Sequence, residues 1–255
     1  MINFWRVLKS DFYKMKNTGF YKIHIIFPII GVLIFLLYFY THTTINYSAN
    51  GKVQMFIEVV SIVFPFLTSI VTSCIMELEK ESSNYKEMLG SSYGRVLPLL
   101  SKITVLLICG FCSLFLTIGL FTVGISFIDK TLAFKFNDLI TVCFILLGCE
   151  LFIYLLHIGI NLIFNKGLSI LIGVGESVLS AIMLTGLGGY IWIYVPSGFE
   201  SRLIGYYLMK ISNYSLYEGF ASIVYKGSID CIFYTIVIFF MLLLYFNHYE
   251  AKSNM

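Results

Sequence analysis

The chain has 255 residues, of which 58% are hydrophobic and 12% charged, and its mean hydropathy is +0.88. Soluble domains carry about 25% charged residues, so this composition excludes a soluble enzyme and predicts an integral membrane protein. The net charge is only +3, which does not indicate nucleic-acid binding.

The length sets the number of membrane spans. About six helices of ~20 residues fit into the chain with short loops between them, and a separate soluble domain does not fit. We therefore predict an all-α integral membrane protein in which residues 1–255 form a single transmembrane domain. Richness in Phe, Ile, Tyr, Asn and Lys is typical of an AT-rich genome and favours a bacterial cell membrane.

Residues 1–18 are predicted to form an interfacial helix. Apolar side chains recur at helical spacing along one side, and cations occupy the other. Such a helix lies in the headgroup plane with its cations near anionic lipid; the alternative is a solvated basic N-terminus. The two sides comprise Phe4, Trp5, Leu8, Phe12 and Met15, and Arg6, Lys9, Lys14 and Lys16.

Six apolar runs predict the membrane spans. Their approximate ranges are 23–41, 53–76, 103–128, 139–164, 168–195 and 228–246. The loops on the side of the N-terminus hold most of the 17 lysines and arginines. By the positive-inside rule, both termini are expected in the cytoplasm.

The segment between the second and third spans, residues 77–95, is the densest charged run in the chain. Charges of this density cannot lie in hydrocarbon, and long helix-forming residues precede Gly90. We predict a short cytoplasmic helix at about residues 79–89, lying under the bilayer and offered to a soluble partner. Residues 196–227 mix polar and apolar positions, and predict an outer amphipathic or re-entrant segment before the last span.

Several ionisable or amide side chains lie inside the predicted spans. Glu58 belongs to the second span, and Glu150, His157 and Asn161 share one face of the fourth, while Glu176 lies in the fifth. A charged group in a span points at protein or water because lipid cannot solvate it. Both a lining for a substrate or proton path and ordinary hydrogen-bonded packing fit these residues.

The fifth predicted span also carries small residues spaced by four, which let another helix approach closely. We interpret this ridge as packing, within the subunit or at a dimer seam. Its members are Gly173, Ser177, Ala181, Thr185 and Gly189.

Motifs for catalysis are absent from the sequence. It contains no Gly-x-x-x-x-Gly-Lys-Ser/Thr phosphate loop, no His-Glu-x-x-His zinc helix and no Gly-x-Ser-x-Gly elbow. Cys109-Gly-Phe-Cys112 lies in an apolar run without a second cysteine pair, so we interpret it as structural. We expect no enzyme activity, metal or cofactor in this chain.

The order of these elements resembles the permease subunits of type-2 ABC transporters over essentially the whole chain. An N-terminal interfacial (elbow) helix, a charged cytoplasmic helix between spans 2 and 3, and an outer amphipathic segment before span 6 carry the resemblance. Within that group the chain is similar to the lantibiotic-immunity permeases of Gram-positive bacteria.

This resemblance implies a separate ATPase dimer that binds ATP and Mg, a second permease subunit of the same or another kind, and surrounding membrane lipid. It implies export of an antimicrobial peptide from the membrane, and a coupling helix that docks into the ATPase. The implied coupling residues are Glu77, Glu79, Glu81, Lys86, Glu87, Leu89 and Arg95.

Three other functions stay open. The cargo of an ABC transporter could instead be a drug, a lipid or a bacteriocin. A proton-coupled secondary transporter would use Glu150 and His157. A membrane sensor or assembly factor would bind a peptide without transporting it.

Overall fold

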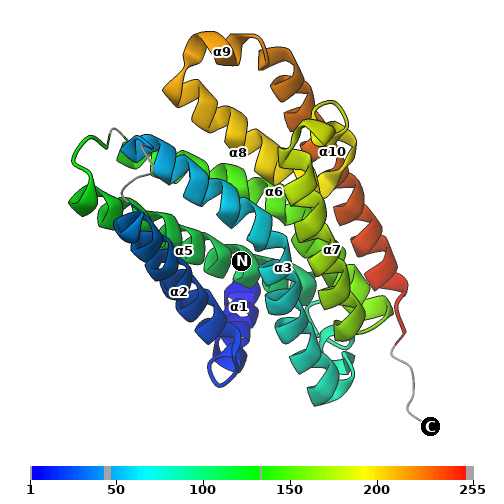
Figure 1. Ribbon diagram of the computed structural model, residues 1–255. Helices are drawn as coiled ribbons and strands as arrows, with labels where there is room; N and C mark the ends of the chain where they lie inside the picture. The colour runs from blue at the N-terminus through cyan, green and yellow to red at the C-terminus, as the bar shows by residue number, and fades with distance from the viewer. Residues whose placement is uncertain (1, 43–46, 133, 251–255) are drawn as a thin grey trace.

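The computed structural model describes residues 2–42, 47–132 and 134–250, and within these ranges the chain is helical without any strand (Figure 1). Six of the described helices are long and apolar enough to cross a membrane. This confirms the predicted all-α multi-pass architecture. The six are α2 (Phe20–Thr41), α3 (Ala49–Ser83), α5 (Val96–Ile128), α6 (Phe136–Ile163), α7 (Lys166–Leu184) and α10 (Ala221–His248).

The remaining described elements are shorter. They are α1 (Ile2–Met15), α4 (Lys86–Leu89), the 3-10 turns η1 (Gly186–Gly188) and η2 (Trp192–Tyr194), α8 (Pro196–Ser212) and α9 (Tyr214–Glu218). Helix α1 packs on α5, and α8 packs on α3, α6, α7 and α10. Helix α9 lies at the far end of the molecule from the last turns of α10 (Figure 1).

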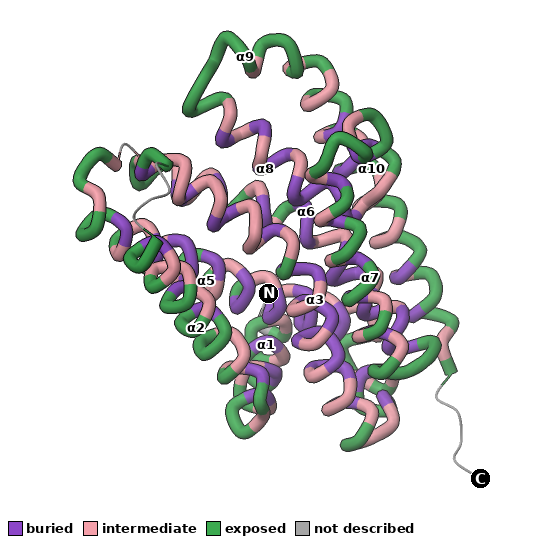
Figure 2. The backbone as a smooth tube through the Cα atoms, in the orientation of Figure 1, coloured by how far each residue is buried: buried purple, intermediate pink, exposed green. Residues whose placement is uncertain are grey.

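Among the six membrane-spanning helices, burial is greatest in α3 and α6. About half of the residues in their most apolar stretches are buried, whereas α2 and α10 remain mostly exposed (Figure 2). The exposed side chains of these outer helices are apolar, for example Leu33 and Leu37 of α2 and Phe233 and Phe240 of α10. An exposed apolar belt of this kind is what lipid contact requires. Helices α3 and α6 therefore form the centre of the bundle.

The predicted helix at about residues 79–89 is wrong in its bounds. Helix α3 continues to Ser83. It is interrupted at Asn84 and Tyr85, whose φ angles are 49° and 63°. Asparagine tolerates this left-handed conformation, which ends a helix. Tyr85 is held there by burial of its ring, and α4 beyond it has only four residues.

Helix α3 is longer than a membrane span. Its 35 residues extend over ~52 Å at ~1.5 Å per residue, whereas the hydrocarbon layer is ~30 Å thick. Its last turns, with Glu79 and Glu81, therefore project beyond the hydrocarbon toward α4. Charges that could not lie in lipid are accommodated in this projecting part.

The predicted end of the fifth span at residue 195 is also wrong, because α7 ends at Leu184. Three of the next five residues are glycines, which are poor helix formers. The Thr185 hydroxyl accepts a hydrogen bond from the Leu187 backbone N–H and starts η1. Thr185 and Gly189 of the predicted small-residue ridge thus lie beyond the helix.

The two ends of the described chain lie on one side of the bundle. Lys14 of α1 pairs with Glu87 of α4, and Arg95 donates to the carbonyl oxygens of Asn247 and Tyr249 at the end of α10. On the opposite side, Lys52 pairs with Asp129 at 3.2 Å. This ion pair joins the start of α3 to the end of α5. This arrangement follows from an even number of spans.

Helices α3 and α7 share the most extensive contact in the bundle, and serines line it. Pro65 has no N–H, so the Ser61 carbonyl lacks its helical donor. The Ser180 hydroxyl of α7 donates to that carbonyl at 3.4 Å, and Ser177 Oγ accepts from the Phe66 N–H at 3.2 Å. The seam thus satisfies backbone groups for which lipid offers no partner.

Gly173 lies at the closest part of this seam. A Cβ atom placed there would overlap the Ser69 side chain of α3 and approach the Pro65 carbonyl oxygen at 3.4 Å. Ser177 continues the contact one turn later, and Ala181 is half-buried. The ridge therefore packs within the subunit.

Gly173 and Gly175 provide a matched test of this packing. We expect Gly173→Ala to lower the free energy of unfolding by about 1–3 kcal/mol through overpacking. Gly175→Ala should raise it by up to about 1 kcal/mol, since alanine favours helix and a Cβ atom there meets nothing within 4 Å. Thermal unfolding in detergent measures both; equal shifts of the two variants would contradict the seam.

Candidate functional site

A buried lysine is the centre of the charged end of the bundle. The side chain of Lys102, near the start of α5, is 1% exposed, and its Nζ pairs with Asp11 of α1 and, at 2.6 Å, with Glu79 of α3. Both carboxylates are buried, and the Ser101 hydroxyl donates to Asp11. Each charge is compensated by an opposite one, as burial requires.

Lys14 extends these contacts to the surface. Its Nζ lies 3.1 Å from Glu79 and 3.0 Å from Glu87 of α4. Burial opposes the charge, but the two carboxylates outweigh it and raise the pKa of Lys14 above its ordinary value. We call the set Asp11, Lys14, Glu79, Glu87 and Lys102 the ionic cluster; it ties α1, α3, α4 and α5 together.

The residues with an expected coupling role are divided by this geometry. Glu79 is buried within the ionic cluster and cannot itself contact a partner protein. Glu81, Lys86 and Glu87 are exposed. The remaining members, Glu77, Leu89 and Arg95, are half-buried.

Deeper in the bundle, His157 of α6 connects two helices. Its Nε2 lies 2.8 Å from a carboxylate oxygen of Glu176 of α7, and its Nδ1 lies 2.9 Å from Ser169 Oγ. One turn on, the Asn161 amide donates to Ser169 Oγ at 3.0 Å and to Ser73 Oγ of α3 at 3.3 Å. The polar face predicted for the fourth span thus points into the bundle.

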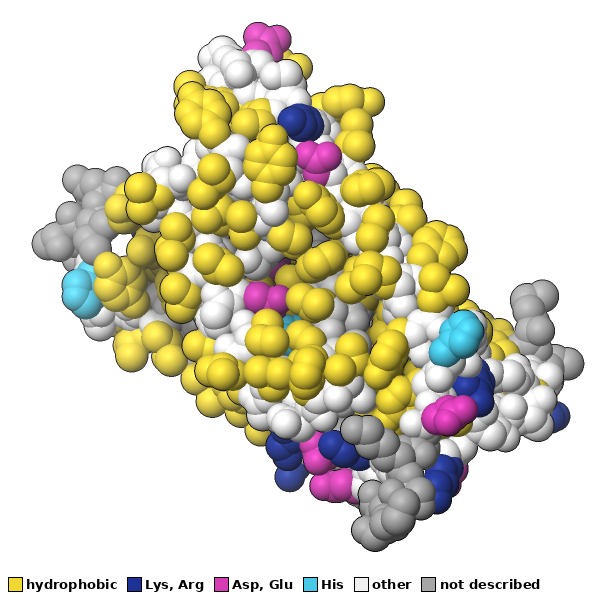
Figure 3. All heavy atoms as spheres, turned by 90° about the vertical axis from the view of Figure 1, so that its right-hand side faces the viewer, with side chains coloured by type: hydrophobic (Ala, Val, Ile, Leu, Met, Phe, Trp, Pro, Cys, Tyr) yellow, Lys and Arg dark blue, Asp and Glu magenta, His cyan; other side chains and the backbone are white. Residues whose placement is uncertain are grey.

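Glu176, which had no assigned partner in the sequence, is explained by this contact with His157. Only 8% of the residue is exposed. Figure 3 shows acidic atoms, with histidine atoms beneath them, at the middle of an otherwise hydrophobic face. Glu58 lies apart from this group, where its carboxylate accepts from Gln54 at 2.9 Å.

A second pair of acids lies between α6 and α8. Glu150 and Glu200 are 0% and 2% exposed, and their carboxyl groups are within hydrogen-bonding reach of each other. The Thr68 hydroxyl of α3 lies beside Glu150. Across the described ranges, no ion pair reaches either acid.

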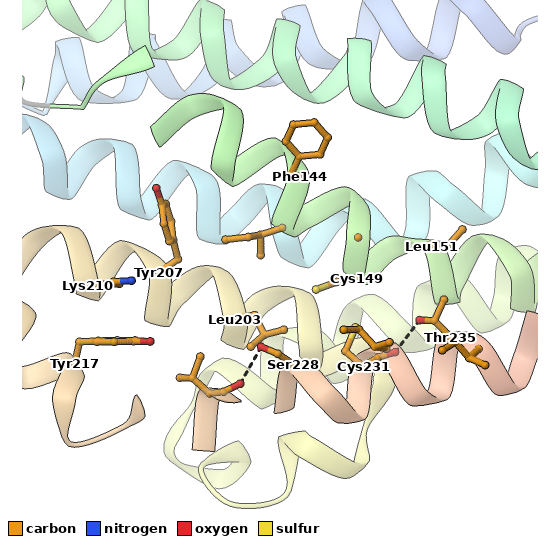
Figure 4. A pocket seen from close by; sticks show the side chains of 15 residues that line it. Phe144, Cys149, Leu151, Leu203, Tyr207, Lys210, Tyr217, Ser228, Cys231 and Thr235 are labelled. Atoms are coloured by element: carbon orange, nitrogen blue, oxygen red, sulfur yellow. Dashed lines mark hydrogen bonds between the residues drawn. The ribbon is translucent and has the colours of Figure 1, made fainter. Parts of the chain in front are cut away.

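Two apolar cavities lie on either side of this acid pair. One of about 510 Å³ opens between α6, α8, α9 and α10, and in Figure 4 Cys149 and Leu203 face Cys231 across it. The other, of about 300 Å³, lies between α2, α3 and α5, with Thr68 and Tyr154 among its lining residues. Both are hydrophobic spaces with a few polar groups.

Sequence reasoning missed Glu200, Asp11 and the burial of Lys102. Glu200 is followed three and four residues later by the buried Leu203 and Ile204, so it shares their apolar helix face. That spacing was the available signal. Asp11 and Lys102 share this spacing, Asp11 with Leu8 and Met15 and Lys102 with Val105 and Leu106. Each nevertheless lies at a predicted membrane boundary, where a charge is ordinary.

Comparisons of the chain with protein-family models, with curated proteins and with solved structures gave no match. The resemblance to type-2 ABC permeases therefore stays a prediction. Within the described ranges, no group of three or more His, Cys, Asp or Glu side chains is placed to hold a metal ion. The ionic cluster and the buried acids and histidine are what the chain offers as functional groups.

The ionic cluster can be tested at Lys102. Lys102→Met leaves the buried Asp11 carboxylate without a cation and Glu79 with Lys14 as its remaining partner, and we expect the free energy of unfolding to fall by about 3–5 kcal/mol. The combined variant Asp11→Asn, Glu79→Gln, Lys102→Met should recover most of this loss. Lys9→Met, at an exposed position of α1, is the control. Thermal unfolding of Lys102→Met indistinguishable from that control would refute the cluster's structural role.

Proposed function

We propose that this chain is the membrane-spanning permease subunit of an ABC transporter that expels an antimicrobial peptide of the lantibiotic type from a bacterial membrane. A separate ATPase dimer binds ATP and Mg and drives it. The observation that supports this proposal is the ionic cluster, which joins α1, α4, the projecting end of α3 and the start of α5 at one end of the bundle.

The ionic cluster makes this end suitable as a lever. A force on the exposed side chains of Glu81, Lys86 and Glu87 is passed to α3 directly and to α5 through the pairing of Glu79 with Lys102. Buried ion pairs resist separation because each lost partner leaves an uncompensated charge. The projecting helix ends therefore move as a unit, and the contact of α3 with α7 carries the motion into the bundle.

The apolar cavity between α2 and α3 suits a peptide that already lies in the membrane. Its lining includes Phe27, Phe35, Phe56 and Phe64, and α2 packs mainly on α5 and only sparsely on α3. An amphipathic peptide can reach such a groove sideways from the lipid, without crossing water. The exposed apolar faces of the outer helices would serve lipid and a second permease subunit.

A proton-coupled secondary transporter is the second candidate. The observation in its favour is the buried pair of Glu150 and Glu200 beside the His157–Glu176 contact. Intramembrane acids of this kind occur in proton relays. Such a transporter would need no ATPase.

Resistance measurements separate the two candidates. We expect a lantibiotic-sensitive strain to survive higher peptide concentrations only when the chain is produced together with its partner ATPase. Replacement of the phosphate-loop lysine of that ATPase should abolish protection. Protection by the chain alone that is lost with a protonophore would overturn the proposal in favour of secondary transport. ATP-dependent efflux of a lipid or drug without protection would overturn the peptide cargo.

The exposed and buried acids of α3 should behave differently on charge reversal. Glu81→Lys is expected to reduce co-purification of the ATPase several-fold without changing the unfolding temperature, because Glu81 is exposed. Glu79→Lys should lower the unfolding temperature, because it places a third cation in the ionic cluster. Glu218→Lys, exposed on α9, is the control for surface charge. Unchanged co-purification with Glu81→Lys would exclude this docking face.

A further inference from the structure

The acid pair of α6 and α8 has no cation to balance it. Counted as carboxylates, Glu150 and Glu200 have four buried oxygens that receive no hydrogen bond. Two adjacent carboxylates repel each other, and burial adds a desolvation penalty for each unpaired ion. A pair of ionised acids therefore cannot persist at this place.

A single proton removes the conflict. Shared between the two carboxyl groups, which are within hydrogen-bonding reach, it turns repulsion into a charge-assisted O–H···O⁻ hydrogen bond. The Thr68 hydroxyl, fully buried and otherwise without a partner, lies beside Glu150 and can donate to the remaining negative charge. Two of the four carboxyl oxygens are then hydrogen-bonded to each other, and a third can accept from Thr68.

We propose that Glu150 and Glu200 form a proton-binding site, in which one bound proton joins α6 to α8 between the two apolar cavities.

The other ionisable groups around the site do not supply a compensating charge. His157 of α6 is already bonded to Glu176 of α7, so any positive charge on its ring has its own counter-ion. Cys149 of α6 and Cys231 of α10 lie nearby, as does Tyr154, and these groups are neutral when protonated. The proton is the cation that this environment lacks.

The position of the site gives the proton a structural consequence. Helix α8 packs between α6, α7 and α3, and residues next to the acid pair line the cavities on both sides: Cys149 and Leu203 on one, Thr68 and Tyr154 on the other. Loss of the proton would drive Glu200 away from Glu150. It would therefore loosen α8 and weaken the partition between the two cavities.

The site predicts how stability depends on pH. The folded chain holds a proton that the unfolded chain releases at neutral pH, so the free energy of unfolding falls as the pH rises. Thermal unfolding of the purified full chain in lipid nanodiscs, followed from mildly acidic to mildly alkaline pH, measures this slope. In Glu150→Gln and in Glu200→Gln, an amide N–H replaces the shared proton, and the slope should decrease by about one proton.

Glu58→Gln is the matched control, because Glu58 is an intramembrane acid with its own donor, Gln54; it should keep the wild-type slope. An equal slope in all variants would overturn the proposal. A pH slope that disappears at a raised sodium concentration would also overturn it, since that would identify a metal cation as the bound species. These outcomes do not depend on the transported cargo or on any ATPase.

Infrared spectroscopy gives an independent measurement if the glutamine variants fail to fold. The wild-type chain at neutral pH should show the C=O stretching band of a protonated carboxyl group, and the band should disappear on alkaline titration. Glu58→Gln should retain it in full. Absence of the band from the wild type at neutral pH would overturn the proposal.

Discussion

The pairing of Lys102 with Asp11 and Glu79 fixes how three helices meet at one end of the bundle. A lysine this deeply buried must be paired, because leaving its charge alone in a low-dielectric region costs several kcal/mol. The two buried carboxylates need the lysine for the same reason. Neither α1 nor the projecting end of α3 can shift relative to α5 without exposing one of these charges. The end of the bundle that faces α4 is therefore rigid, although α4 itself is a single turn.

The interior of the bundle follows from the same rule applied to uncharged groups. In a membrane, each backbone or side-chain polar group must find its partner within the protein. Pro65 leaves the Ser61 carbonyl without a helical donor, and the Ser180 hydroxyl of α7 supplies one. His157 and Asn161 find theirs on α7 and α3. The hydrogen bonds that buried polar groups require thus determine which helices pack together in the centre. Apolar side chains fill the space between them.

Hydropathy and helical spacing predicted what depends on single helices: the six spans and the polar face of α6. They failed where a residue far along the chain determines the end of a helix or the burial of a side chain. The end of α3 extends through Glu79 because Lys102 and Lys14 neutralise that carboxylate, and the break at Tyr85 depends on burial of its ring. Glu200 was placed in an outer amphipathic or re-entrant segment without a partner, because nothing local shows that Glu150 faces it. Periodicity shows which face of a helix is buried, but not which group lies opposite.

The charged end of the bundle and the buried acid pair are connected through α6. The Tyr85 hydroxyl, at the break before α4, lies 3.4 Å from the Asn161 carbonyl oxygen, and Asn161 begins the chain of contacts that leads through His157 toward Glu150. A displacement of α4 by a partner would therefore reach α6, the helix that carries Glu150. Linkage is reciprocal: if moving α4 changes how strongly the pair holds its proton, then proton binding must change the energy of moving α4 by the same amount. A motor acting on α4 and a proton bound by Glu150 and Glu200 are for this reason compatible, and the coupling between them depends on how rigidly α6 transmits the motion.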